Sequence, residues 1–170
     1  MKKLLFGLII FTLSSCSYSF SGTSIPAEMK TVSVPIFENN AALVDPYLSN
    51  DFTDAFKDRI RTQSKLSVTL SGAQGKFEGT ITDYDIKPIS IQDNTKPVAG
   101  ANRLTITVNV TFTNSVKGYE KQSFTNRPFT AFTDFSLAGQ SFAPQQKALN
   151  KKVIDQLTEN IFNAAFAQWQ

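Results

Sequence analysis

The chain has 170 residues, of which 41% are hydrophobic and 18% charged, which is typical of one folded domain and too apolar for a disordered chain. It has no histidine and a single cysteine. An internal disulfide and a thiolate metal cluster are therefore excluded, and the side chain most used for proton transfer is missing. The net charge of +3 includes Lys2 and Lys3, and without them 15 basic residues face 14 acidic ones. With no basic cluster in the sequence, nucleic-acid binding is disfavoured.

The first fifteen residues have the order of a secretory signal. Lys2 and Lys3 precede an apolar run at residues 4–13, and two small serines follow. A run of about ten residues is shorter than the roughly 20 that span a bilayer, so a signal is favoured over an uncut membrane anchor.

The signal ends in a motif that resembles the lipobox of bacterial lipoproteins. Leu13-Ser14-Ser15 precedes Cys16, the single cysteine of the chain. The resemblance implies cleavage before Cys16 and acylation of its thiol and new amine, which anchors a protein without a spanning helix. An unmodified thiol after an ordinary signal is the alternative. The polar residues 16–28 then form a tether, residues 29–170 form a single domain, and Ser17 in place of aspartate fits sorting to the outer membrane.

The first part of this domain predicts a strand followed by a helix. Residues 29–37 alternate, with Val32, Val34 and Ile36 on one side, and a proline near the end indicates an edge or strand terminus. Asp45 is expected as the N-cap of a helix that ends near Ser64. Its apolar stripe recurs every fourth residue, at Leu48, Phe52, Phe56 and Ile60.

Two β segments follow the helix, a short one at residues 66–70 and a long one at residues 76–91. In the long segment Phe77 and Ile81 have the opposite parity to Tyr84 and Ile86, which indicates a β-bulge. Gly79 in its interior indicates a bulge or a close approach of the backbone.

The strongest strand pattern lies at residues 103–114, after a loop expected at residues 92–101. Five apolar residues alternate there with threonine and asparagine, so one face should be buried and the other polar. Residues 119–127 predict a return strand. Four phenylalanines near it either join the core or form an exposed contact surface, and the core is favoured: Phe124, Phe129, Phe132 and Phe135.

A second helix is predicted at residues 144–169, with a wide apolar face. The element order is then β-α-β-β-β-(β)-α. It predicts an α+β fold in which two helices pack on one face of a four-stranded, possibly five-stranded, mixed sheet. The first β-α-β unit should place its strands in parallel, adjacent or one strand apart.

Three stretches together with the lipobox resemble the LptE-like family of lipopolysaccharide-assembly lipoproteins, in the form found in Bacteroidetes. They are residues 77–84 (FEGTITDY), 102–110 (NRLTITVNV) and 161–169 (IFNAAFAQW). The resemblance implies a protein without enzymatic activity, metal or cofactor, apart from the covalent lipid on Cys16. It implies a plug and folding partner for the outer-membrane barrel LptD, on the periplasmic side, that assists lipopolysaccharide delivery.

The resemblance also implies a contact with lipopolysaccharide phosphates through basic residues near the loop before the long strand. Lys96 and Arg103 occupy that region. The alternative, that both are ordinary solvated charges, is the favoured one.

Two other functions compete with this interpretation. An enzyme would need paired carboxylates, and the nearest pair is Asp83 and Asp85, two apart on a strand and so on one face. No nucleophile motif accompanies them, so an enzyme is disfavoured. A different envelope lipoprotein on a similar fold, such as a transporter auxiliary subunit or a structural module, stays open because fold alone does not decide function.

Overall fold

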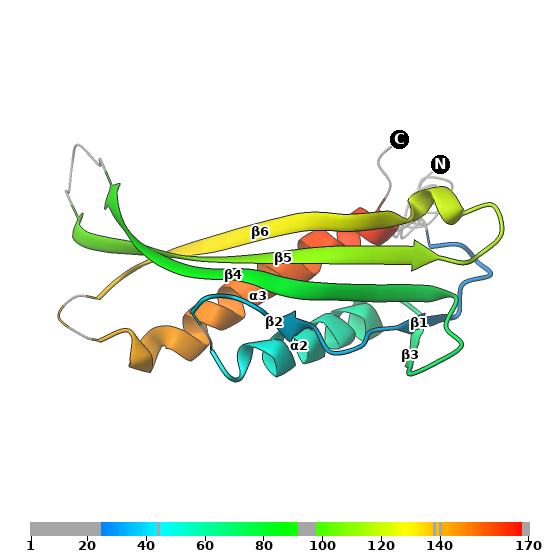
Figure 1. The fold of residues 1–170 in the computed structure, drawn as a ribbon, viewed down its shortest axis with the longest axis horizontal. Helices are drawn as coiled ribbons and strands as arrows, with labels where there is room; N and C mark the ends of the chain where they lie inside the picture. Colours follow the sequence, from blue (N-terminus) through cyan, green and yellow to red (C-terminus); the bar gives the residue numbers. More distant parts are fainter. Residues whose placement is uncertain (1–24, 44, 92–97, 138, 140, 168–170) are drawn as a thin grey trace, which may run out of the picture.

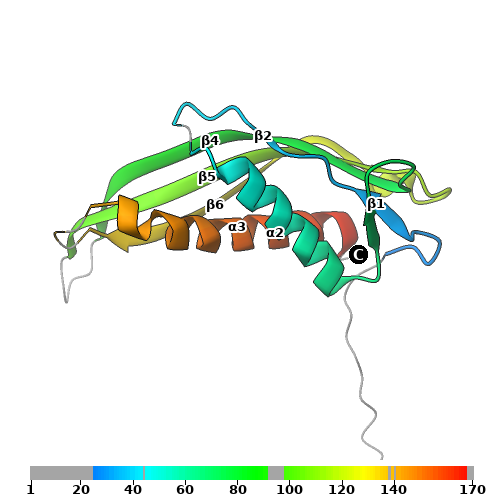
Figure 2. The same ribbon diagram turned by 90° about the horizontal axis from the view of Figure 1, so that it is seen from below.

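The computed structural model describes residues 25–43, 45–91, 98–137, 139 and 141–167. In this part of the chain two long helices cover one face of a mixed six-stranded sheet, and the opposite face carries no helix (Figures 1 and 2). The strand order is β3-β1-β4-β5-β6, with β2 also paired to β4. The predicted α+β class with both helices on one face is confirmed, and the sheet has two more short strands than the minimum expected.

The first strand is shorter than its alternating pattern suggests. β1 (Thr31–Ser33) ends two residues before Pro35, and β2 (Glu38–Asn39) then rejoins the edge of β4. Between them the alternation breaks, so Ile36 is 57% exposed and Phe37 is fully buried. The prediction that Ile36 shares a buried side with Val32 and Val34 is wrong, because the chain leaves the sheet after Ser33.

Phe37 is positioned by a glycine and a threonine. Its N–H donates to Thr53 Oγ1 of α2 at 3.0 Å, and its ring lies against Gly79 of β4. A Cβ on Gly79 would lie 2.5 Å from Phe37 Cε1 and 2.5 Å from the main-chain oxygen of Asn109. The predicted close approach at Gly79 is therefore confirmed.

Helix α2 (Leu48–Gln63) buries the predicted stripe and ends one residue before Ser64. Asp45 is not its N-cap, because Tyr47 holds that position without a side-chain cap. The Asp45 carboxylate accepts the Tyr47 N–H at 3.0 Å and also the amide groups of Gln146 and Asn150, at 2.9 and 2.7 Å. Asp45 thus links the start of α2 to the second long helix, α3 (Ala143–Phe166).

The link extends to the sheet through Tyr84. Its hydroxyl hydrogen-bonds to Asn150 Oδ1 at 2.9 Å, and both side chains are buried. Burial raises the pKa of Tyr84 to about 12. The phenol therefore stays neutral at neutral pH and completes a satisfied polar cluster between the two helices and β4.

The middle strands follow the predicted pattern closely. β3 (Ser67–Thr69) pairs in parallel with β1, as expected of a β-α-β unit. β4 (Gly75–Ile91) pairs antiparallel with β5 (Val98–Asn114), with a register shift between Ile81 and Asp83. That shift is the predicted bulge, and it lets Ile81 and Tyr84 both point into the core.

The segments on either side of the long strand differ from expectation at their ends. β5 begins at Val98, inside the loop expected at residues 92–101. A short 3-10 turn, η2 (Glu120–Gln122), precedes β6 (Phe124–Ser136), so the return strand starts later and runs further than predicted. Pairing along β5 extends it, because β6 stays in register from Phe124 to Ser136 apart from one shift.

Aromatic rings fill the space between sheet and helices. Phe77 and Phe112 stack with ring centroids 4.4 Å apart, and Phe166 of α3 meets both edge-on at 5.8 and 5.5 Å. On the α2 side Phe56 meets Phe77 edge-on at 4.9 Å. These contacts join both helices to β4 and β5 through one continuous core.

The four phenylalanines near β6 divide between the two faces of the sheet. Phe129 and Phe135 are buried and Phe124 is partly buried, as the core interpretation predicts. Phe132 is 47% exposed, because it pairs with Thr105 on the face that no helix covers. For Phe132 the core prediction is wrong.

Replacement of Gly79 by alanine tests the close packing of β2 against β4. Because the new Cβ meets the main-chain oxygen of Asn109, which cannot rotate away, and the buried Phe37 ring, Gly79→Ala should lower the free energy of unfolding by about 1–3 kcal/mol. Urea unfolding measures the change. Thr113→Ala, at an exposed position of β5, is the control and should change stability by less than about 0.5 kcal/mol. Equal stability of the two variants would contradict the packing described.

Candidate functional site: the open polar face of the sheet

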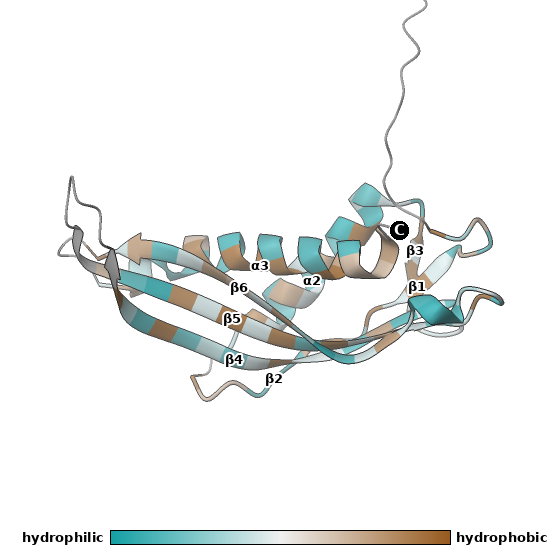
Figure 3. Ribbon diagram, turned by 90° about the horizontal axis from the view of Figure 1, so that it is seen from above, coloured by the Kyte–Doolittle hydropathy of each residue, from teal (hydrophilic) through white to brown (hydrophobic). Residues whose placement is uncertain are grey.

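The face of the sheet opposite the helices is built from the alternation of β5. Its apolar residues point to the helices and its polar residues point away. Figure 3 shows the alternation of hydropathy as bands along the strand. The pairing registers place polar residues of β4 and β6 on the same side. We call this surface the open polar face. Its residues are Glu78, Thr80, Asp83, Asp85, Lys87, Arg103, Thr105, Thr107, Asn109, Thr111, Pro128, Thr130, Phe132 and Asp134.

The centre of the open polar face is polar but carries little charge. Thr107 and Thr130 share a hydrogen bond between their hydroxyls at 3.0 Å, and Thr111 Oγ1 accepts the Asn126 N–H at 3.0 Å. Each hydroxyl has one donor and two acceptor sites, so further hydrogen bonds to a partner remain open to it. The hydroxyls of the centre can therefore be covered by another polar surface at little cost, and Asp83, the register partner of Thr107, is the charge there that a partner would have to pair.

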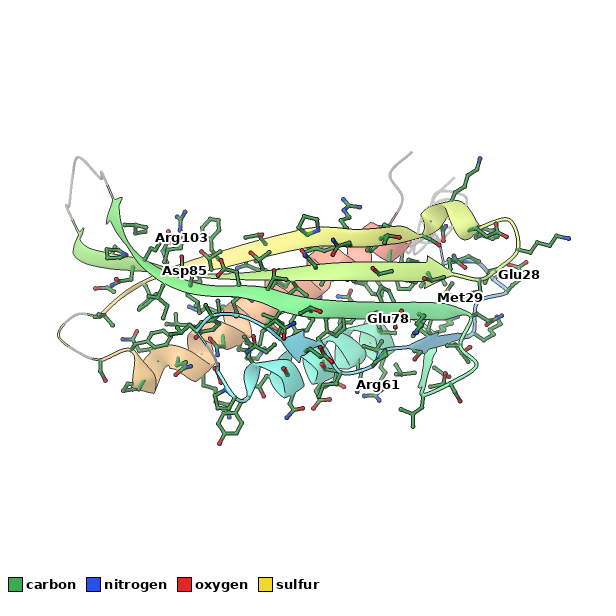
Figure 4. All side chains as sticks on the ribbon, in the orientation of Figure 1. Glu28, Met29, Arg61, Glu78, Asp85 and Arg103 are labelled. Atoms are coloured by element: carbon green, nitrogen blue, oxygen red, sulfur yellow. The ribbon has the colours of Figure 1, made fainter. Side chains whose placement is uncertain are left out.

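Charged residues gather on this face toward the β4–β5 hairpin. Arg103 donates from Nε and an Nη to the two carboxylate oxygens of Asp134, at 2.6 and 2.9 Å. Its guanidinium carbon lies 3.8 Å from the centroid of the Phe132 ring. Lys87 is the register partner of Arg103 on β4, and it pairs with Asp85 at 2.6 Å. Figure 4 labels Arg103 and Asp85 at this part of the sheet.

These ion pairs shift the pKa values of Arg103, Asp134 and Lys87. The hydrogen bonds from Arg103 hold the pKa of Asp134 below its usual value of 3.8, and Asp134 raises the pKa of Arg103 in return. A hydrogen bond to Asp85 raises the pKa of Lys87. These shifts favour the charged forms of Arg103, Asp134 and Lys87 at neutral pH. Two of the five guanidinium donors of Arg103 are occupied by Asp134, which leaves its outer edge for an added anion.

Of the three sequence-predicted site residues, the structure places Arg103. Arg103 lies on the open polar face, whereas Lys96 and Cys16 lie outside the described residues. Sequence reasoning missed Asp134 and Phe132 as the partners of Arg103. The alternation within residues 124–136 could have indicated that Phe132 and Asp134 share a face of the strand. Their contact with Arg103 follows only once the pairing of β5 with β6 is known.

The carboxylates considered for catalysis also lie on this face. Asp83 and Asp85 pair with Thr107 and Thr105, so both lie on one face of the strand, as predicted, and that face is the one away from the helices. Asp85 is engaged by Lys87. Among the described residues no group of three or more metal-ligating side chains comes together.

In the described part of the chain a groove also lies between α2 and α3. Acidic residues of α2 line one wall and basic residues of α3 the other. Arg59 crosses it, donating to Thr158 Oγ1 at 3.0 Å and to the Asp155 main-chain oxygen at 2.9 Å. The groove therefore contains a structural link between the helices.

Fold and site together define a class: a small α+β protein whose sheet has one face under two helices and one open polar face. The family model "LptE: Lipopolysaccharide-assembly" matches residues 29–165, which include both helices and all six strands except the last residue of α3. The chain belongs to the LptE family of lipopolysaccharide-assembly proteins. This is a non-enzymatic family of envelope lipoproteins.

Comparison with curated proteins finds no match. Solved structures with the same architecture include a hypothetical protein from Chlamydia trachomatis, with TM-score 0.52, 8% identity, and coverage of 81% of this chain and 98% of the other. A protein from Xanthomonas campestris has TM-score 0.51 and 13% identity, with coverage of 82% and 87%. A minor lipoprotein from Acinetobacter baumannii has TM-score 0.48 and 16% identity, with coverage of 79% and 91%. The first two share the fold of this chain.

No helix within the described ranges has the length and apolarity needed to cross a membrane.

The Arg103–Asp134 pair predicts the titration of Asp134. Its carboxyl should titrate below 3.8 in the wild-type protein and return toward that value in Arg103→Gln, as followed by carboxyl-carbon NMR. Because the folded pKa is depressed, the stabilisation is present above the unfolded pKa and is lost as pH falls through the folded one. Arg127→Gln removes a cation of β6 that lies over Phe124 and Phe129, and it should leave Asp134 unchanged. An unshifted Asp134 in the wild type would contradict the pairing.

Proposed function

We propose that this protein is an outer-membrane lipoprotein, anchored through lipid on Cys16 at the periplasmic side. In this proposal it serves as plug and folding partner of an LptD-type β-barrel during lipopolysaccharide delivery. The observation that carries the proposal is the match of the LptE family over residues 29–165. The open polar face and the lipobox at Cys16 support it independently.

The open polar face suits the interior of a barrel for a physical reason. Large outer-membrane barrels are apolar outside and polar inside, so a plug must offer hydrogen bonds rather than apolar area. The hydroxyls of Thr105, Thr107 and Thr130 supply such bonds without bringing charge. Phe132, at 47% exposure, adds one aromatic contact of the kind that anchors protein interfaces.

The helix-covered face offers less to a partner. Its apolar residues are buried in the aromatic core, and the outward-facing side chains of α2 and α3 include acidic and basic groups. A barrel lumen that met this face would have to desolvate many charges, which costs free energy unless each is paired. We therefore assign the partner surface to the open polar face.

Contact with lipopolysaccharide is the finer part of the proposal, and its candidates are Lys96 and Arg103. Arg103 has a second cation beside it in the register, Lys87, and a planar guanidinium that fits phosphate oxygens. Its bond to Asp134 means that a phosphate would bind the free edge of the fork or displace the carboxylate. Lys96 is proposed on the resemblance alone.

A matched pair of variants tests the assignment of the partner surface. Thr107→Arg places a bulky cation at the centre of the open polar face, where Asp83 across the strands helps the fold to accept it. Gln156→Arg makes a comparable change at an exposed position of α3. In cells with one variant as the single copy, barrel co-purified with Thr107→Arg should fall at least tenfold, and surface lipopolysaccharide should fall with it. Gln156→Arg should match the wild type.

Two results would overturn the proposal. Equal recovery of the barrel with both variants would remove the open polar face from the interface. Recovery of inner-membrane transporter subunits in place of a barrel would instead favour a transporter auxiliary protein on the same fold.

A further inference from the structure

The N-terminal strand segment enters the sheet at the end away from Arg103. Figure 4 labels Glu28 and Met29 at one end of the sheet and Arg103 toward the other. The β3–β4 turn and the connection between β5 and β6 lie at the same end as Glu28 (Figure 1). We call residues 28–30, 65–74 and 115–123 the anchor end.

Gln74 ties the three segments of the anchor end together. Its side-chain amide donates to the Glu28 main-chain oxygen at 2.8 Å and accepts the Lys30 N–H at 2.6 Å. Its own main-chain oxygen accepts the Ser115 N–H at 2.8 Å. The turn and the β5–β6 connection are therefore fixed beside the point where the chain enters the domain.

The exposed side chains of this end are of the types found at membrane surfaces. Leu70 is 98% exposed and Tyr119 is 39% exposed, although both are large and apolar or amphipathic. Tyrosine is enriched at the level of lipid headgroups, where one end of the ring is apolar and the other wet.

The charge of the anchor end is basic on balance. Its exposed charged residues are four lysines and two glutamates: Lys30, Lys65, Lys117, Lys121, Glu28 and Glu120. The Glu120 carboxylate also accepts the Gly118 N–H at 2.9 Å. Lysines near an anionic lipid surface are attracted to it over a distance of about 10 Å at moderate salt.

The lipid attachment site is close to this end along the chain. Eight residues lie between Cys16 and Ile25, so the connection spans at most about 30 Å even when fully extended. The anchor end is thus the part of the domain that a lipid on Cys16 holds nearest to the bilayer. This step rests on the lipidation that we proposed above.

We infer that, before it meets its barrel, the lipoprotein rests on the membrane by the anchor end. Lys117 and Lys121 then lie against anionic phospholipid headgroups, and Leu70 and Tyr119 lie at the interface. This contact leaves the open polar face and Arg103 clear of the membrane and free to receive the partner. The occupant of this surface is a lipid surface, not a protein.

The test uses the mature acylated protein in vesicles of phosphatidylethanolamine and phosphatidylglycerol without a barrel. Acylation blocks Cys16, so a single introduced thiol carries the fluorophore, either in Ser115→Cys at the anchor end or in Ala143→Cys at the start of α3, the opposite end. A headgroup-bound quencher should quench the first label at least threefold more strongly than the second. Equal quenching of the two labels would overturn the inference.

Charge is tested with a matched pair in the Ser115→Cys background. Lys117→Gln with Lys121→Gln should weaken the membrane contact about 25-fold, at about fivefold per lysine. Lys147→Gln with Lys152→Gln, two exposed lysines of α3, should leave it unchanged. Undiminished quenching in the first pair would overturn the role of the lysines. Labelling of the protein without an introduced cysteine would reveal a free Cys16 and overturn the anchor, whereas a failure to capture a barrel leaves this result intact.

Discussion

The structure depends on the opposite polarity of the two faces of β5. Leu104, Ile106, Val108, Val110 and Phe112 are all fully buried toward the helices, while the residues between them carry hydroxyl or amide groups. The stack of Phe77 on Phe112 and the edge contacts of Phe166 with both rings fasten the helices to that apolar face. A slip of β5 by one residue would turn its apolar side chains away from the helices. The register is therefore strongly specified, and the polar side chains stay on the face that no helix covers.

An open, hydrogen-bonding sheet face is the surface to which we assign the partner. Antiparallel sheets commonly expose one face to water, so openness alone is not evidence of a partner. Three features distinguish this surface from an ordinary solvated one. They are the threonines at its centre, the half-exposed Phe132, and two neighbouring cations at one side, each paired with a carboxylate. Because the chain belongs to the LptE family, we propose that this face meets the polar interior of a barrel.

The sequence predicted those parts of the fold that depend on local periodicity. The stripe of α2, the alternation of β5 and the parity change in β4 each map onto a buried face or a bulge. It failed where long-range contacts override the local pattern. Ile36 is exposed because Phe37 takes the space above Gly79, and Asp45 bonds to Asn150, 105 positions away, rather than capping α2. The pairing of Arg103 with Asp134 likewise could not be predicted before the register of β5 and β6 was known.

The central claim is that the open polar face meets the barrel. A photo-crosslinking residue at Thr130, in living cells, tests it most directly, with Gln156 of α3 as the comparison site. If the open polar face meets the barrel, the Thr130 position forms a covalent adduct with a large outer-membrane barrel and the Gln156 position does not. Adducts from Gln156 alone, or from neither position while the barrel still co-purifies, would contradict it.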